Sequence, residues 1–180
     1  ATDNATGSMV VMEAARVIMQ SGLKPKRTMR FILFSGEEEG LLGSVAYAAK
    51  HASDLNNVQA VLVLDNGTGM ITGQALQGRN QDAQLWQDLL APVASLGASK
   101  VREANKGGTD HLAFTPYGVP GWNFDQEVRG YNHTHHSQVD TYDHAVPGDL
   151  RQASAVMAVT GFELANLPAL LPRGPTREVT

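Results

Sequence analysis

The 180-residue sequence has no cysteine, no excess of basic charge and no long apolar run. Without cysteine the chain forms no disulfide framework and no thiolate metal site, although this does not fix its compartment. No apolar run reaches the ~18 residues that a membrane-spanning helix needs, so no membrane span is expected. Fourteen Lys and Arg against eighteen Asp and Glu give a net charge of −4. A mildly acidic chain without a basic stripe is a poor candidate for binding nucleic acid.

The rest of the composition is typical of one folded domain. With 42% hydrophobic and 18% charged residues, the chain is neither disordered, collagen-like nor a coiled coil. Apolar spacing predicts helices over residues 9–21, 40–51, 82–96 and 149–165, with Pro92 as a possible break and with Asp149 and Gln152 as a capping box. Short apolar runs predict buried strands over residues 29–34, 58–64 and 119–124. This alternation predicts an α/β layered domain over residues 1–167, with a mostly parallel sheet flanked by helices and a polar tail over residues 168–180.

Acidic residues stand where the predicted strands end. Glu37, Glu38 and Glu39 follow the strand over 29–34, Asp65 follows the strand over 58–64, and Asp3 precedes the first helix. Each has a plain structural interpretation, because acids favour helix N-termini, Asp-Asn-Gly forms turns and an Asp-Asn segment can cap a helix. Polar groups at the carboxyl ends of parallel strands, however, are also where α/β proteins bind ligands.

Histidines cluster near the end of the chain, where four of the six lie between residues 133 and 144. A histidine-rich surface loop is one interpretation, and a metal site is the other. Carboxylate and imidazole ligands without cysteine suit Zn²⁺ or a similar ion in a hydrolytic site. Two such ions can share a carboxylate, and a carboxylate that binds no metal then accepts the proton of water. The adjacent pair Glu37 and Glu38 offers both a base and a ligand.

Four segments follow one another in the order found in a known family: Asp3-Asn4-Ala5-Thr6-Gly7, Glu37-Glu38-Glu39-Gly40-Leu41-Leu42-Gly43-Ser44, Asp65, and His136-Ser137-Gln138-Val139-Asp140-Thr141. A fifth is Gly107-Gly108-Thr109-Asp110-His111, followed by Gly118-Val119-Pro120. The set resembles the zinc-dependent aminopeptidase family of the bacterial leucyl aminopeptidases, and within it the carboxypeptidase Q group with its bacterial relatives. Each segment alone is weak, but the ordered set is specific and extends over nearly the whole chain.

The resemblance implies a three-layer, zinc-exopeptidase-like fold and a role for each matching residue. Asp3 resembles the carboxylate that bridges two zinc ions, and Glu37 resembles the general base. Glu38 and His136 resemble ligands of one zinc, and Asp65 resembles a ligand of the other. By the same register, the neighbouring histidines at 133 and 135 are weaker ligand candidates.

The resemblance also implies a substrate surface, formed by Asp110, His111, Trp122 and Phe124. Asp110 has the alternative interpretation of a helix cap, and Trp122 that of a core residue. The implied reaction is hydrolysis of peptide bonds in short peptides or dipeptides near a free amino terminus, in a secreted or periplasmic enzyme. Two alternatives stay open: a glutaminyl-cyclase-like enzyme on the same scaffold, and a catalytically inactive binding fragment.

One part of the family pattern is missing. The family has a His ligand in a Gly-His-x-Asp segment before the bridging carboxylate, whereas only Ala1 and Thr2 precede Asp3 here. We therefore expect an N-terminally truncated fragment of a longer enzyme. The zinc beside Glu38 keeps three expected ligands (Asp3, Glu38 and His136), but the zinc beside Asp65 keeps only two. The sequence thus predicts two zinc ions in the intact enzyme and at most one well-formed site in this chain.

Overall fold

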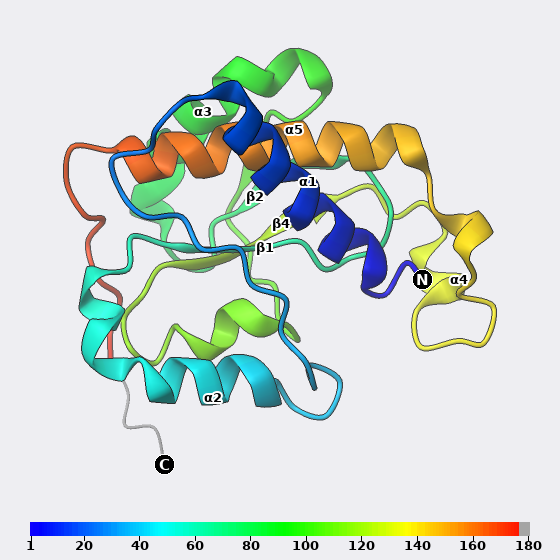
Figure 1. Ribbon diagram of the computed structural model, residues 1–180, viewed down its shortest axis with the longest axis horizontal. Coiled ribbons are helices and arrows are strands. Elements are labelled where there is room, and N and C mark those ends of the chain that lie inside the picture. Colours follow the sequence, from blue (N-terminus) through cyan, green and yellow to red (C-terminus); the bar gives the residue numbers. More distant parts are fainter. Residues whose placement is uncertain (177–180) are drawn as a thin grey trace.

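A four-stranded sheet lies between two layers of helices in the computed structural model, which describes residues 1–176 (Figure 1). The α-helices are α1 (Ala5–Ser21), α2 (Leu42–Lys50), α3 (Ala83–Leu90), α4 (Tyr131–Thr134) and α5 (Pro147–Asn166). The strands are β1 (Val61–Val63), β2 (Ile71–Ala75), β3 (Lys100–Arg102) and β4 (Gly121–Gln126). Short 3₁₀ helices are η1 (Ala52–Asn57), η2 (Asn80–Asp82), η3 (Ala91–Leu96), η4 (Asp110–Ala113) and η5 (Tyr142–His144).

The strand order is β1-β4-β2-β3. β1 pairs with β4 in parallel, β2 pairs with β3 in parallel, and β2 pairs with β4 in antiparallel register. α1, α3 and α5 cover one face of the sheet, and α2 with η4 covers the other (Figure 1). The predicted α/β domain with three layers and a mostly parallel sheet is therefore confirmed, with one antiparallel pairing in it.

Two apolar clusters hold the layers together. In the larger, Trp86 of α3 meets Trp122 and Phe124 of β4 edge to face, with ring centroids 5.2 and 5.8 Å apart. The smaller cluster includes Leu55 and Phe114 and lies under α2. Aromatic side chains bury large areas, so these contacts fix β4, and with it the centre of the sheet, between the helix layers.

The helix predictions were largely correct in extent but not in how the helices begin. α1 starts earlier than predicted because the Asn4 side chain accepts a hydrogen bond from the Gly7 amide as its cap. The predicted helix over 82–96 ends as α3 at Leu90 and continues as the 3₁₀ helix η3. Pro92, the predicted break, lies in the first turn of η3. The capping box in α5 is wrong, since Asp149 pairs with Arg129 and Gln152 bonds to the Ile71 backbone. None of the helices in residues 1–176 is both long and apolar enough to cross a membrane.

The predicted strand over residues 29–34 is wrong. The segment has no strand assignment, and its side chains Phe31 and Leu33 are 40% and 55% exposed. A strand needs a neighbour for its backbone hydrogen bonds, but a cleft of about 1050 Å³ lies between this segment and the stretch around β1. β2 and β3 were not predicted, because β2 carries Gly73 and Gln74 and β3 has only three residues.

Candidate metal centre

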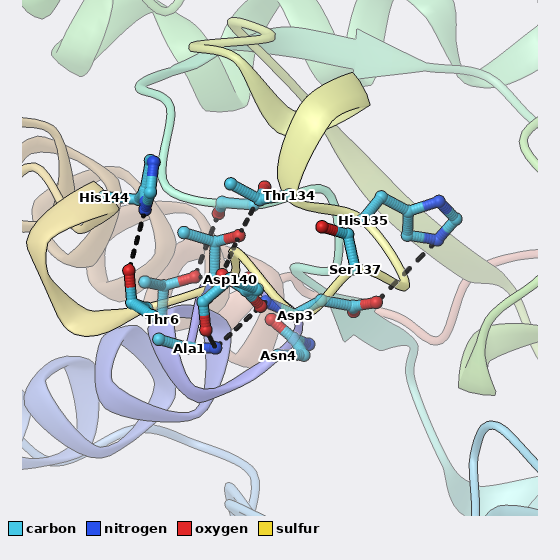
Figure 2. Close-up of polar contacts among 12 residues, drawn as sticks. Ala1, Asp3, Asn4, Thr6, Thr134, His135, Ser137, Asp140 and His144 are labelled. Atoms are coloured by element: carbon cyan, nitrogen blue, oxygen red, sulfur yellow. Dashed lines mark hydrogen bonds and ion pairs between the residues drawn. The ribbon is translucent and has the colours of Figure 1, made fainter.

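Three segments far apart in the sequence meet at one end of the cleft. Asp3 precedes α1, Glu38 lies before α2, and His136 follows α4. The His136 Nε2 atom lies 2.7 Å from Glu38 Oε2 and 3.4 Å from Asp3 Oδ2. His135 Nε2 lies 3.7 Å from the same Asp3 oxygen (Figure 2). The structure thus brings together the three side chains that the sequence predicted around one zinc, and it adds His135.

The donor set fits a small divalent ion. Asp3, His135 and His136 each offer a ligand atom, and these atoms lie within 4.8 Å of one another. Two ligand atoms ~2.1 Å from a tetrahedral zinc lie about 3.4 Å apart, close to the separation of Asp3 Oδ2 and His136 Nε2. Nitrogen and carboxylate oxygen are ligands that zinc prefers. Neither Asp65 nor Glu38 is part of this group of three, although Glu38 contacts His136.

Glu37 borders the same cleft beside four other acids. Desolvation, and then the nearby charges of Asp65, Glu38, Asp110 and Asp3, raise the pKa of Glu37 to about 7. A carboxyl with a pKa near neutrality can both accept and release a proton under physiological conditions. A bound cation would lower this pKa, because its charge opposes that of the surrounding carboxylates.

Asp65 sits at the end of the β1 segment and is fixed by its neighbours. The Thr109 hydroxyl donates to Asp65 Oδ2 at 2.6 Å, and the Asp65 amide donates to the buried Asn123 Oδ1 at 3.2 Å. Desolvation raises the pKa of Asp65, the Thr109 hydrogen bond opposes that, and the charges of Asp3, Asp110 and Glu38 add to the rise. Asp65 lines the same cleft as the other acids of the site.

The loop that carries Thr109 also carries a partly buried lysine. The Lys106 ammonium donates to Asn66 Oδ1 and, at 2.6 Å, to the Phe124 carbonyl. It lies 3.7 Å from Asp125 Oδ1. Desolvation lowers the pKa of Lys106, although the Asp125 charge opposes this. Asp65 and Asn66 are therefore both held from the same loop, in contacts that sequence spacing gave no means to predict.

Tyr131, which the sequence reasoning missed, faces the centre from α4. Its ring packs against His135, with centroids 4.8 Å apart. Desolvation, followed by the charges of Asp3 and Asp65, raises the pKa of the Tyr131 phenol, so the hydroxyl stays protonated. A side chain added at Gly67 would lie 2.6 Å from the Tyr131 ring, so glycine at 67 makes room for it. A lone tyrosine before a histidine-rich loop carries no spacing signal by which to find it.

The four residues predicted to face a substrate fall into two groups. Asp110 borders the cleft, and burial raises its pKa. His111 is fully buried, neither ring nitrogen has a hydrogen-bond partner among residues 1–176, and desolvation lowers its pKa to about 4. Trp122 and Phe124 are also fully buried, in the core around Trp86. In this structure these three side chains offer no surface to a substrate, and Trp122 follows the core interpretation.

The chain is similar to known peptidases over most of its length. The profile of peptidase family M28 matches residues 1–160. Carboxypeptidase Q from Mus musculus is 31% identical over 173 residues, which make up 96% of this chain and 37% of the mouse protein. The crystal structure of a peptidase M28 precursor from Shewanella amazonensis is 30% identical with a TM-score of 0.88, over 97% of this chain and 40% of that one.

A zinc aminopeptidase structure from Bacillus subtilis, with a TM-score of 0.72 at 24% identity over 90% of this chain and 41% of that one, shares the fold. The chain thus spans well under half the length of these relatives.

Proposed function

Because the chain belongs to peptidase family M28, we propose that it carries the zinc site of an exopeptidase that hydrolyses short peptides or dipeptides near a free amino terminus. One observation carries the proposal. His136 Nε2 lies 2.7 Å from Glu38 Oε2 and 3.4 Å from Asp3 Oδ2, although the three residues are far apart in the sequence. Solvated loops of acids and histidines would have no reason to converge in this way.

In this proposal Asp3, Glu38 and His136 hold one zinc, and Asp65 is the residue available toward a second. We expect at most one well-formed site in this chain, because a second zinc would have only Asp3 and Asp65 as its expected ligands. When bound, zinc polarises a carbonyl group and makes water more acidic. Glu37 accepts the proton of the attacking water and passes it to the leaving amine, for which a pKa of about 7 suits it.

The two alternatives are favoured less by the site. A glutaminyl-cyclase-like reaction also needs one zinc and a Glu base, but the relatives described above are named as peptidases. A binding fragment without catalysis would not need Glu37 beside the zinc ligands, with its pKa raised toward neutrality. Export to the periplasm or outside the cell is part of the proposal, and fractionation of the source cells tests it.

The experiment starts from chain stripped of metal with a chelator. We expect equilibrium dialysis to give one zinc per chain, and we expect zinc to restore hydrolysis of an aminoacyl chromogenic substrate. Glu37→Gln should keep the zinc and lose ~10²–10⁴-fold in rate, because a positioned general base contributes about that much. Glu39→Gln is the matched control, since Glu39 is an exposed acid two residues away. Full activity in Glu37→Gln, or glutaminyl cyclisation without hydrolysis, contradicts the proposal.

A further inference from the structure

Asp140 joins the first residues of the chain to the loop that follows α4, beside the candidate metal centre. Its Oδ1 atom accepts hydrogen bonds from the Thr2 amide at 2.7 Å and the Thr2 hydroxyl at 2.8 Å. Its Oδ2 atom accepts one from the Asp3 amide at 3.0 Å. Figure 2 shows Asp140, which belongs to the loop that follows α4, beside these first residues. A single carboxylate therefore takes up two consecutive backbone N–H groups 137 and 138 residues away in sequence.

The contact is built into the interior. The Asp140 side chain is 10% exposed, and Thr2 and Thr134 are buried with their hydroxyl oxygens 2.9 Å apart. Burial opposes ionisation of Asp140, yet hydrogen bonds from the N-terminal amine, Thr2 and Asp3 lower its pKa. Charged acceptors bond backbone N–H groups about twice as strongly as neutral ones. The three bonds from Thr2 and Asp3 do not depend on the charge of the terminal amine.

The position of Asp140 matters because of what it joins. On one side lies Asp3, whose carboxylate faces both histidines. On the other lies the short loop that begins with His135 and His136 and ends at Asp140 itself. The next residue, Asn4, is tied separately to the end of the β1 segment, since its side chain donates to the Leu64 carbonyl at 3.0 Å. Asp140 is thus the direct polar link between the backbone of Asp3 and the histidine loop.

We propose that Asp140 is a positioning residue, which sets the carboxylate of Asp3 opposite His136 and so tightens the zinc site. Both of its carboxylate oxygens accept hydrogen bonds from Thr2 and Asp3, so it would not itself be a metal ligand. This inference rests on the proposed zinc site, but its geometric part concerns the two segments with or without metal. In other proteins, removing a group that orients a metal ligand weakens metal binding ~10–100-fold.

The main test compares Asp140→Asn with Asp143→Asn. Asparagine keeps the size of Asp140 but has one acceptor oxygen, and its amide NH₂ would face one of the two backbone N–H groups. Asp143 is an 81% exposed acid three residues further along, in η5, so it is the matched control. We expect zinc to bind ~10–100-fold more weakly to Asp140→Asn and unchanged to Asp143→Asn. The visible spectrum of bound Co²⁺, which a purely structural role would not alter, should change only in Asp140→Asn.

Two further measurements test the role of Asp140 independently of zinc affinity in Asp140→Asn. Without metal, the Thr2 and Asp3 amides should exchange with solvent at least ~10-fold faster in Asp140→Asn than in the wild type. Thr2→Val removes the two hydrogen bonds of the hydroxyl, to Asp140 and with Thr134, and leaves the backbone amide bonds in place. It should therefore fold and bind zinc less than ~10-fold more weakly. Unchanged zinc affinity in both variants, or unchanged exchange of the two amides, overturns the role of Asp140. A wild-type chain that binds no zinc contradicts the proposed function instead. In that case the exchange rates of the Thr2 and Asp3 amides still test whether Asp140 holds these residues in place.

Discussion

The two adjacent histidines of the centre differ in what their rings contact. His136 has a left-handed backbone with φ of 53°, and its Nε2 atom reaches both Glu38 and Asp3. His135 reaches only Asp3, at 3.7 Å, and stacks against Tyr131 and His136. The left-handed turn, which is uncommon outside glycine, is what sends the two neighbouring rings to the same acid.

This difference predicts unequal effects of removing each ring. His136→Ala should weaken zinc binding at least ~100-fold, because a metal ligand is lost, whereas His135→Ala should weaken it ~10-fold or less, as for a residue that only supports the ligands. Isothermal titration of the metal-free variants measures both. The reverse order would make His135 the ligand and would refute the register by which the sequence favoured His136.

Glu37 makes stability depend on pH in a definite direction. Its pKa rises from the ordinary value of 4.5 to about 7 in the folded, metal-free chain. The folded state therefore holds the proton more tightly than the unfolded state, and the stability gained is present below pH ~4.5 and lost as the pH rises through about 7. Melting temperatures in chelator should fall between pH 5 and 8 by more in the wild type than in Glu37→Gln. Parallel curves for the two proteins would show that Glu37 has an ordinary pKa.

At the scale of whole elements, the sequence predicted the helices and located β1 and β4, but it missed β2 and β3 and wrongly predicted a strand over 29–34. Regular apolar spacing and an aromatic run were sufficient for α1, α5 and β4, since burial alone decides such segments. The segment over 29–34 carries the same apolar signal as a buried strand, yet pairing depends on a neighbour that lies elsewhere in the chain. No local sequence pattern shows whether a neighbouring strand is present to pair with this segment.

The residues of the candidate site were also predicted only in part. Glu37, Glu38 and Asp65 were found because they follow apolar segments that were predicted as strands, and Asp3 was found because it stands in the family's ordered set of motifs. The structure brings Asp3 and Glu38 together with His136. The groups that fix them were not found. Thr109 and Lys106 hold Asp65 and Asn66, and Asp140 holds Asp3, through contacts that no spacing along the chain predicts. Likewise, Trp122 and Phe124 follow one another on a strand, but only packing shows that both are core.

Over the whole molecule, the most unusual feature is a gap within the sheet layer. The cleft is bordered on one side by residues 27–34, on the other by residues 57–65, and above by α1 and α5, and it ends at Asp3, Glu37 and Asp65. β1 pairs on one side only, with β4, so its other edge faces the cleft. Consistent with this, the apolar residues of β1 are only half-buried, whereas β4, which has a strand on each side, is buried along most of its length.

This open edge predicts a contrast between neighbouring amides. The Val61 amide donates to the Pro120 carbonyl beside β4, so the next N–H along the strand, that of Leu62, points into the cleft. In amide exchange by NMR, Leu62 and residues 29–34 should exchange at least ~100-fold faster than Val61, because open backbone groups exchange without unfolding. Equal protection of Leu62 and Val61 would mean that the edge is covered. If protection then weakened on dilution, a second copy would be the cover, as exposed strand edges tend to pair with one another.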